Sequence, residues 1–449
     1  MSPHLNLERK PKIPRKIPHR VVIVGGGPAG IYSLYQLVQH PKISLKTPSG
    51  ENPVILFEAK PFLGGRVPLA CPIKAVKLIQ KPPKNKKVEE VTAGEIGAEQ
   101  VASWQLSALQ SCGIQINPSK CIQRVRVFEL RRGSKREEFI ELRRCPVNFI
   151  YAVEQGCFQK SEGELSSQCP NSYADQISDY WQNGQIKSGY AAYRVSFSEV
   201  VLQILENISP TVICEQVRCG CQVTKISTMP DGNFEVYLDS EHCVKAHAIF
   251  LAIPPHQLAY IKAPKKIETL FRTLATEIPA KPWPQKISLV VDNYNEATND
   301  PFNESECIVG FNLKGGKRVV VELWKAQDLP NQRALISGVV IIDDETNVNE
   351  ETLTELIECV EQFLKQFLGN QTAYIQKCTI VNHQEISGLS YNFYPGDQIF
   401  FDKIMPILKQ LEQERIYLCG DAYNQNFGHV LGAFESADFA IKKYLDSLT

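Results

Sequence analysis

The glycine-rich segment at residues 25–30 constrains the fold of this chain more than any other feature. The apolar run Val21 to Val24 precedes it and a helical pattern follows, so G-x-G-x-x-G lies between a strand and a helix. In that setting Gly25 permits a tight turn, Gly27 lets a diphosphate approach the main chain, and Gly30 lets the helix pack on the strand. The sequence therefore predicts a dinucleotide site; a glycine-rich turn without a ligand is the alternative.

The residues after this turn complete the expected unit. The helix begins with Pro28 and Ala29, and its N-terminus offers free N–H groups and partial positive charge to the diphosphate. A second apolar run, Val54 to Phe57, ends in Glu58, whose carboxylate is placed to accept hydrogen bonds from the ribose 2′- and 3′-hydroxyls. The usual spacing to this acid is about 20 residues, and the polar stretch 41–53 is a loop insertion that lengthens it here.

A second glycine pair, Gly64 and Gly65, follows the acid and is itself followed by Arg66. On these residues the sequence resembles the flavin amine oxidase superfamily, in which G-G-R follows the ribose acid. The resemblance implies that the glycine pair lets the main chain pass close to the diphosphate of FAD and that Arg66 adds positive charge there. Another turn without a ligand is the alternative.

The C-terminal region extends the resemblance. A strand-like run ends in Gly420 and Asp421, and a G-x-x-x-G-A segment at 428–433 leads into an apolar helix. The superfamily has a strand, G-[DE], a short loop and a helix that points at the flavin. By that resemblance Asp421 would bond the ribityl chain, and the main chain near Leu431 would face the N1/O2 edge of the ring, which gains negative charge on reduction. The cofactor residues expected here are Gly420, Asp421, Val430, Leu431 and Ala433.

Three internal segments also resemble the superfamily. Residues 94–101 resemble a stretch that passes the flavin ring, and residues 222–254 resemble the hairpin beside the adenine, with Val223 on its first strand. Lys286 falls where the family often has a lysine that holds a water near flavin N5. No cysteine lies in 388–396, where monoamine oxidases attach the flavin, so we expect noncovalent FAD. Within the superfamily, the strings LAIPP at 251–255 and CGDAY at 419–423 most resemble those of bacterial tryptophan and other L-amino-acid oxidases.

Catalysis and substrate contact are expected from residues beside these motifs. The catalytic candidates are Lys286, His429 and Tyr391, and the substrate-pocket candidates are Glu99, Gln100, Tyr190, Phe393 and His429. His429 occupies the position of an aromatic cage residue, where it would be a base, a donor or a cage wall; a structural histidine is the alternative. Tyr391 and Phe393 lie on a segment that lines the flavin ring in the family, and Tyr391 as a core residue is an equal interpretation.

One position departs from the family pattern. Amino-acid oxidases of this type follow a G-A pair with an arginine that pairs with the substrate carboxylate, whereas Glu99 and Gln100 follow it here. Glu99 would repel a carboxylate and would suit a second cationic group, so the sequence favours an amine or polyamine over a standard amino acid. A distant arginine, such as Arg194 or Arg333, is the alternative partner for a carboxylate.

The composition is that of an ordinary globular protein. The 449 residues are 43% hydrophobic and carry equal numbers of basic and acidic side chains, so net charge gives no argument for nucleic acid. No apolar run approaches the ~20 residues of a membrane helix. The 14 cysteines, in a chain whose start lacks a signal-peptide core, are expected to be reduced thiols in the cytosol. Cys219 and Cys221 lack a partner pair, so no metal site is expected.

The order of the motifs predicts an α/β fold with two units. A discontinuous, Rossmann-like FAD-binding domain is expected in three pieces, 19–71, 201–257 and 406–449. A substrate domain with a mixed sheet and helices is expected at 72–200 and 258–405, after a disordered basic tail at 1–18. Apolar spacing predicts a helix over 351–368, and the lysine- and proline-rich stretch 72–90 is expected to be an exposed loop.

The expected function is FAD-dependent oxidation of the C–N bond of an amine or amino acid to an imine, with dioxygen as acceptor and hydrogen peroxide as product. A desaturase or dehydrogenase of the same superfamily is one alternative, because Gly420 and Asp421 fit that group as well. A flavin-bound protein without turnover is the other, because Glu99 and His429 are unusual. The expected partner is a small-molecule amine or amino acid, with no nucleic acid and no membrane span, and a homodimer is left open.

Overall fold

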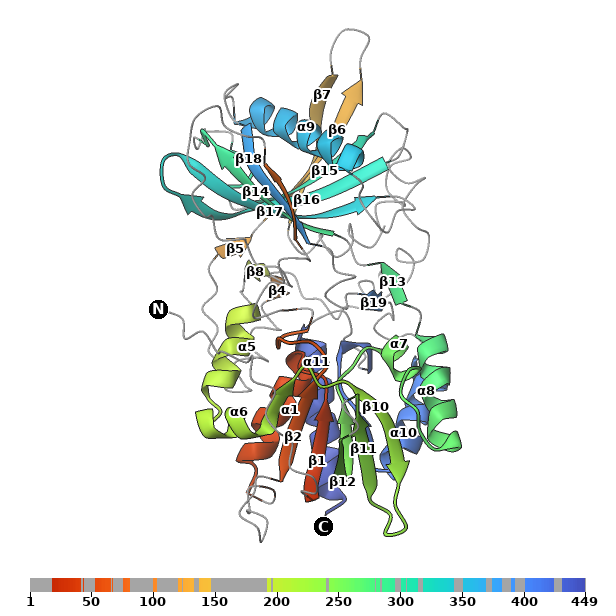
Figure 1. Ribbon diagram of the computed structural model, residues 1–449. Coiled ribbons are helices and arrows are strands. Elements are labelled where there is room, and N and C mark those ends of the chain that lie inside the picture. Colours follow the sequence, from red (N-terminus) through yellow and green to blue (C-terminus); the bar gives the residue numbers. More distant parts are fainter. Residues whose placement is uncertain are drawn as a thin grey trace.

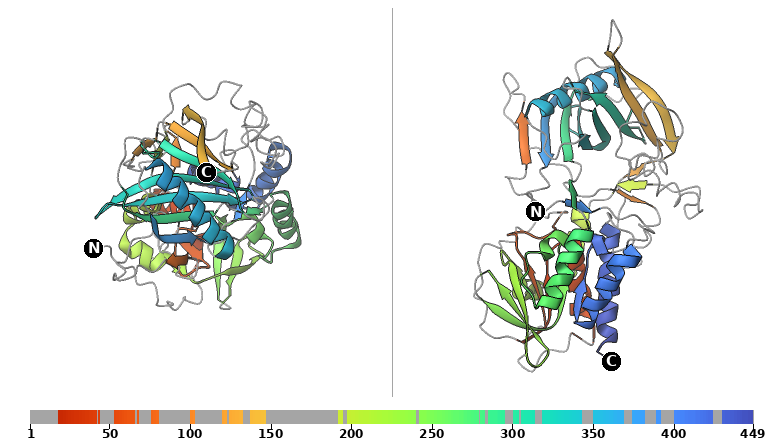
Figure 2. Two further views of the ribbon diagram at one scale, coloured as in Figure 1. Left: turned by 90° about the horizontal axis from the view of Figure 1, so that it is seen from above. Right: turned by 90° about the vertical axis from the view of Figure 1, so that its right-hand side faces the viewer.

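The computed structural model consists of two units stacked along the long axis of the molecule (Figures 1 and 2). The first unit contains the glycine-rich turns and the C-terminal helix, and the second contains a large mixed sheet. The residues that the structure describes are 18–41, 43, 53–65, 67, 76–80, 100–102, 120–122, 124–132, 137–146, 192–194, 197–239, 242–278, 280–282, 285–294, 300–303, 305–313, 318–342, 350–368, 374–381, 389–391, 400–423 and 430–448.

The described part of the first unit has a seven-stranded sheet in the order β10-β11-β12-β1-β2-β9, with β20 beside β12. Pairing is parallel from β12 through β1 and β2 to β9 and between β12 and β20, and antiparallel between β10, β11 and β12. The strands are β1 (Pro18–Val24), β2 (Val54–Glu58), β9 (Val217–Cys219), β10 (Val223–Thr228), β11 (Phe234–Leu238), β12 (Cys243–Leu251) and β20 (Ile416–Leu418).

Helices cover both faces of this sheet, because its central strands are apolar on both sides. In β1, Val21 and Ile23 belong to one core and Val22 and Val24 to the other, and all four are buried. The first core contains α1 (Pro28–Gln39), α5 (Phe197–Glu206), α6 (Pro210–Gln216) and α11 (Val430–Asp446). The second contains α7 (Pro255–Leu258), α8 (Lys265–Glu277) and α10 (Met405–Gln413), which follows the π-helical turn η4 (Phe400–Ile404).

Helix α1 and the C-terminal helix α11 meet in the first core. The ring of Tyr32 on α1 lies 4.9 Å from the ring of Phe434 on α11, measured between centroids. Phe250 on β12 stacks on Tyr417 of β20 at 5.0 Å, and Tyr417 meets Tyr444 of α11 edge to face at 5.8 Å. Aromatic pairs of this kind add to the apolar burial, so α1, β20 and α11 share one core.

The second unit has, in its described part, an eight-stranded sheet in the order β3-β18-β14-β17-β16-β15-β6-β7. β15 and β6 are parallel and the other neighbours are antiparallel, so the sheet is mixed. The strands are β3 (Val76–Gln80), β6 (Arg124–Arg132), β7 (Glu137–Pro146), β14 (Gln285–Asp292), β15 (Ser305–Asn312), β16 (Arg318–Leu329), β17 (Arg333–Ile342) and β18 (Tyr374–Val381).

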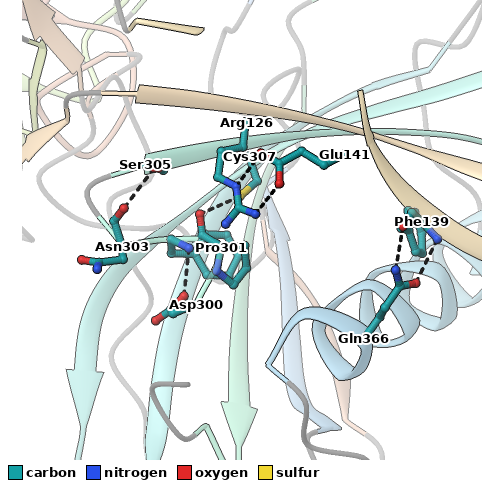
Figure 3. Close-up of polar contacts among 10 residues, drawn as sticks. Arg126, Phe139, Glu141, Asp300, Pro301, Asn303, Ser305, Cys307 and Gln366 are labelled. Carbon is teal, nitrogen blue, oxygen red and sulfur yellow. Dashed lines mark hydrogen bonds and ion pairs between the residues drawn. The ribbon is translucent and has the colours of Figure 1, made fainter. Parts of the chain in front are cut away.

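Helix α9 (Glu350–Phe367) covers one face of that sheet. Phe363 meets Phe128 of β6 and Phe139 of β7 edge to face, with centroids 4.9 and 5.4 Å apart. Gln366 anchors the helix, because its amide accepts the Phe139 N–H at 2.9 Å and donates to the Phe139 carbonyl at 2.6 Å (Figure 3). The opposite face of the sheet turns toward the first unit (Figures 1 and 2).

A polar cluster fixes the strands beside α9. Arg126 of β6 makes a bidentate pair with Glu141 of β7, with N–O distances of 3.0 and 2.6 Å (Figure 3). The Cys307 thiol donates to the Pro301 carbonyl at 3.2 Å, and Asp300 accepts the Phe302 N–H at 2.8 Å. Complete burial raises the pKa of Cys307 well above its ordinary value, so this thiol stays neutral. These contacts join β6 to β7 and join β15 to the loop that precedes it.

Two small sheets lie between the units (Figure 1). One joins β4 (Gln100–Ala102), β8 (Ala192–Arg194) and β5 (Lys120–Ile122), and the other joins β13 (Ala280–Pro282) and β19 (Leu389–Tyr391). Among the residues described, no helix is both long enough and apolar enough to cross a membrane.

The predicted fold class is confirmed, but the packing moves two predicted boundaries between the units and turns one predicted loop into a strand. Residues 197–200 belong to the first unit, because Phe197 and Val200 are buried in its core. Residues 258–278 belong there too, because the apolar face of α8 packs on the second core of that unit. Residues 76–80 form β3 rather than a loop, because their main chain pairs with β18 at the edge of the large sheet. Residues 1–17 lie outside the described part, whereas Pro18 is the first residue of β1.

Candidate cofactor-binding site

The first unit contains a cavity of about 800 Å³ at the carboxyl ends of its parallel strands. This edge of an open α/β sheet is where ligands usually bind. Its walls come from the first glycine turn, the end of β2, the start of β10, residues 252–261 and residues 419–423. The sequence-predicted residues that line it are Gly25, Gly27, Pro28, Ala29, Glu58, Gly65, Val223, Gly420, Asp421 and Ala433. Segments from both ends of the chain therefore line one cavity.

Gly25 and Gly30 are glycines for reasons of backbone conformation and packing. Gly25 has φ +105°, and its N–H donates to the Phe57 carbonyl at 2.7 Å. A Cβ at Gly25 would lie 2.4 Å from the Ala252 carbonyl oxygen, and one at Gly30 would lie 1.9 Å from the Gly25 carbonyl oxygen. The turn between β1 and α1 therefore closes only with glycine at both positions, as the sequence predicts.

Gly27 is different, because neither strain nor packing against the protein requires a glycine there. Its φ of −75° and ψ of −179° suit any residue. The nearest atom to a Cβ built on it, leaving out its chain neighbours, is the Gly65 Cα at 3.9 Å, an ordinary contact. Gly27 lines the cavity. The space that a side chain would fill is therefore available to a ligand.

The second glycine turn is held directly against the first. The Gly64 N–H donates to the Gly26 carbonyl at 2.8 Å. Gly65 has φ +57°, and a Cβ on it would lie 3.0 Å from the Gly27 Cα. The two turns thus present main chain to the same part of the cavity, beside the N-terminus of α1. Arg66 lies outside the described residues.

Glu58 is held at the end of β2 by two main-chain N–H groups. Its Oε2 accepts the Gly26 N–H at 2.6 Å, and its Oε1 accepts the Lys60 N–H at 2.7 Å. Burial raises the pKa of this carboxyl, and these main-chain bonds and Lys60 oppose the rise. Each carboxylate oxygen accepts more than one hydrogen bond, so Glu58 keeps acceptor capacity on the side that lines the cavity.

The residues that follow the edge strand β9 are hydrogen-bonded to the segment around Glu58. The Gly220 N–H donates to the Lys60 carbonyl and the Cys221 N–H to the Glu58 carbonyl, both at 2.9 Å. Burial, with a smaller contribution from Glu58, raises the pKa of Cys219 to about 12. Among the described residues, no group of three or more His, Cys, Asp or Glu side chains is arranged to hold a metal ion. Of the two cysteines, Cys221 lines the cavity.

The C-terminal segment at residues 419–423 forms another wall of the cavity. Gly420, with φ +144°, donates its N–H to Ser436 Oγ of α11 at 2.7 Å. Asp421 starts the short 3₁₀ helix η5 (Asp421–Tyr423) and is buried, and the Tyr423 hydroxyl donates to the Ile253 carbonyl at 2.9 Å. These bonds tie the loop after β20 to both α11 and the loop after β12.

Other predicted positions are placed only in part. Gly30 and Gly64 shape the turns without lining the cavity, and Val430 and Leu431 lie in the first turn of α11. Lys286 pairs with Val339 and Val381 in the middle of the large sheet, Tyr391 pairs with Ala280, and Gln100 pairs with Arg194. Four residues lie outside the described part: Glu99, Tyr190, Phe393 and His429. The side chains of Lys286, Tyr391, Gln100, Val430 and Leu431 also lie outside it.

Several lining residues have no motif in the sequence. They include Lys60, Phe62, His256, Gln257 and Tyr260. One signal was present, because residues 252–261 follow strand β12 at the same edge of the sheet as the glycine turn. A parallel neighbour of the first strand brings its following loop to the ligand edge, whatever residues that loop contains.

Comparison with known proteins shows the fold. No protein-family model matches the chain, and no curated protein matches its sequence. Among solved structures, putrescine oxidase bound to putrescine matches with a TM-score of 0.50, at 13% identity over 96% of this chain and 100% of that chain. Two variants of putrescine oxidase redesigned in cofactor binding match with a TM-score of 0.51 over the same shares. This chain shares the fold of putrescine oxidase. The fold implied by the resemblance to flavin amine oxidases is therefore confirmed.

Proposed function

We propose that this chain is an FAD-dependent oxidase that converts the C–N bond of an amine or amino acid to an imine and passes the electrons to dioxygen, giving hydrogen peroxide. The observation that carries the proposal is Gly27, which lines the cavity although the protein itself leaves room for a Cβ there. A ligand that approaches the main chain closely gives a reason for that glycine. A diphosphate at a helix N-terminus is such a ligand.

The groups around the cavity fit the parts of FAD. Glu58 would accept hydrogen bonds from the ribose, the main chain at Gly27 and Gly65 would hold the diphosphate, and the segment from Gly420 to Ala433 would hold the ribityl chain and the ring. The volume of about 800 Å³ falls in the usual range for ligand pockets of about 300–1,000 Å³. Bound FAD would supply the acceptor for the hydride that leaves the substrate carbon.

The protein would then orient the substrate and keep it neutral. An alkylammonium has a pKa of about 10, and a dry chamber disfavours its charge, so burial between the two units would promote loss of the proton. We propose that Lys286 holds a water beside the reacting centre and that His429 and Tyr391 border the substrate. Tyr190, Phe393 and Gln100 are the other proposed walls.

We favour an amine over an amino acid. Glu99 follows the G-A pair where a carboxylate-binding arginine would be needed, and a carboxylate there would attract a second cationic group. The fold shared with a putrescine-bound structure supports the same substrate class. An L-amino acid remains the second substrate class to test.

We propose the cytosol as the location and leave a homodimer open. Several cysteines whose side chains the structure describes are free thiols, which suits a reducing compartment. They include Cys214, Cys219, Cys243, Cys307 and Cys419.

The proposal is tested by incubating the purified protein with diamines, monoamines and L-amino acids and measuring peroxide. Gly27→Val is the matched control, because it should lack flavin and give no peroxide. Peroxide with an amine, together with flavin reduction by that amine without oxygen, would support the proposal. Reduction only by a tetrapyrrole or lipid-like compound would indicate a dehydrogenase instead. A flavin that none of these compounds reduces would indicate a protein without turnover.

A further inference from the structure

Tyr260 is an aromatic residue with an unusual position. It is 72% exposed, the most exposed of the large hydrophobic side chains among the described residues. Its neighbours in the chain are firmly anchored, since Leu258 is fully buried and Ile261 is 4% exposed. Tyr260 also lines the cofactor cavity. An exposed ring on a fixed backbone at the edge of a cavity is available to pack against a ligand.

Main-chain bonds place the segment around Tyr260 beside the start of β10, near the part of the cavity that Glu58 lines. The Lys262 N–H donates to the Thr224 carbonyl at 3.0 Å, and the Ile226 N–H donates to the Lys262 carbonyl at 2.8 Å. The segment around Tyr260 therefore runs beside the first residues of β10. Val223 is the first residue of β10 and lines the cavity. Two residues earlier in the chain, the Cys221 N–H donates to the Glu58 carbonyl, so Val223 lies near Glu58.

The short helix α7 holds the wall next to Tyr260. The Gln257 N–H donates to the Pro254 carbonyl at 2.9 Å, and the Tyr260 N–H donates to the Gln257 carbonyl at 3.2 Å. The Gln257 side-chain amide donates to His256 Nε2 at 2.8 Å, and both side chains line the cavity. Pro255 and Leu258 of α7 are buried, so packing against the second core holds this wall.

We propose that Tyr260 packs its ring on the adenine of the bound dinucleotide, opposite Val223. This inference rests on the proposed function and adds a specificity residue to it. Adenine is flat, apolar on its faces and bonded to the ribose that Glu58 would hold, so it belongs at the end of the cavity where Tyr260 and Val223 lie. Binding would cover a ring that is otherwise exposed to water, which stabilises the complex through apolar burial and stacking.

The test compares ligands with and without adenine. Full-length protein freed of bound flavin is titrated calorimetrically with FAD, ADP and FMN, the last of which lacks the adenosine. The variants are Tyr260→Ala, Tyr260→Phe and, as the matched control, Phe439→Ala, which removes a 49% exposed ring from α11 away from the cavity lining. Circular dichroism checks that each variant is folded.

Tyr260→Ala should raise the dissociation constants of FAD and ADP about tenfold, the expected order for loss of one stacked base. FMN affinity should not change. Tyr260→Phe and Phe439→Ala should bind all three ligands as the wild type does. Equal FAD and ADP affinity in Tyr260→Ala and wild type would overturn the inference, and so would an equal loss for FMN.

The wild-type protein separates failure of this inference from failure of the proposed function. If it binds ADP but not FAD, and Tyr260→Ala weakens ADP, then the flavin function is wrong and the adenine contact stands. If it binds FAD while Tyr260→Ala changes nothing, the adenine contact alone is wrong. If it binds neither ADP nor FAD, both are wrong.

Discussion

The amide of Gly64 donates a hydrogen bond of 2.8 Å to the carbonyl oxygen of Gly26. This bond ties together two glycine turns that are separated in the chain by α1 and β2. It brings Gly65 so close to Gly27 that a Cβ on Gly65 would lie 3.0 Å from the Gly27 Cα. The proposed diphosphate site therefore has the main chain of Gly27 on one side and that of Gly65 on the other. A methyl group on Gly65 would narrow the space between them.

Gly27→Val should remove the bound flavin without unfolding the protein. The valine side chain would occupy part of the cavity, and its Cβ would not clash with the protein. The substitution should therefore weaken ligand binding rather than folding. Flavin content should drop to near zero, while the unfolding free energy matches that of wild-type protein stripped of flavin. The comparison needs stripped protein because a bound ligand adds stability. A yellow Gly27→Val protein would refute the assignment of the diphosphate site.

Gly30→Ala is the matched control for that change. Its methyl group would lie 1.9 Å from the Gly25 carbonyl oxygen, so the turn itself must move. We expect a loss of about 2 kcal/mol or more in the unfolding free energy of the stripped protein, as for an overpacked core. Equal stability of Gly30→Ala and Gly27→Val would contradict the separation between a packing glycine and a ligand glycine.

Glu58→Gln should change how stability depends on pH. Burial raises the pKa of the Glu58 carboxyl above its ordinary value of 4.5. An acid with a raised pKa in the folded state favours folding below its ordinary pKa, and that contribution is lost as pH rises through the raised value. The stability of the stripped Gln variant minus that of the stripped wild type should therefore increase from pH 4.5 upward and then level off. Urea unfolding of both stripped proteins over a pH series measures this stability difference. A difference that decreases as pH rises would show that the pKa of Glu58 is lowered in the folded protein instead.

The cysteines should differ sharply in reactivity. Burial raises the pKa values of Cys419 and Cys219 to about 12, whereas Cys214 is exposed. The thiolate is the reactive form, so iodoacetamide at pH 8 should modify Cys214 in the native protein and leave Cys419 and Cys219 nearly unmodified. Mass spectrometry of peptides gives the extent at each site, with urea-unfolded protein as the control in which all three react. Equal labelling of Cys419 and Cys214 in native protein would contradict the complete burial of Cys419.

Gln366→Ala should loosen the second unit while leaving the cofactor site intact. The amide of Gln366 satisfies both the N–H and the carbonyl of Phe139, and loss of two such bonds costs about 1–2 kcal/mol. Gln362→Ala, one turn earlier, removes a single exposed bond of 3.3 Å to the Glu137 carbonyl and should cost less than about 0.5 kcal/mol. Urea unfolding measures both. A larger effect of the Gln362 change would contradict the proposed anchor of α9.

Lys286→Met tests the proposed role of the lysine in the reaction with dioxygen. We expect reoxidation of the flavin to slow by about tenfold or more, as for loss of one positioned group, while reduction by the amine changes less. Stopped-flow measurement of the two half-reactions separates these effects. Equal slowing of both would indicate a general loss of geometry at the site.

The parts of the fold that follow local rules were predictable from the sequence. β1, the glycine turn and α1 are such a case, since Gly25 needs a positive φ and Gly30 has no room for a Cβ. The C-terminal strand and helix were predictable by resemblance. The predicted loop at 76–80 was wrong because β3 exists only through its pairing with β18, a contact that the local lysine-rich composition does not show.

The sequence predicted the motif residues of the site, but not the contacts that depend on the folded chain. Glu58 was expected from its place after β2, but its bonds to the Gly26 and Lys60 N–H groups depend on the folded turn. Tyr260 belongs to no sequence motif; its segment was indicated only by its place after β12, and its position at the cavity also depends on the bonds between Lys262 and β10. The predicted substrate contacts depend on Lys286 and His429. The structure describes the strand that contains Lys286, β14, whereas His429 lies outside the described residues.

The visible absorption spectrum of the purified protein, recorded without oxygen before and after addition of a diamine, reports both flavin binding and reduction of the flavin by an amine. We expect flavin bands in the wild-type spectrum, their absence in Gly27→Val, and bleaching of the wild-type bands by the amine. A colourless wild-type protein that also fails to take up added FAD would contradict the proposed function.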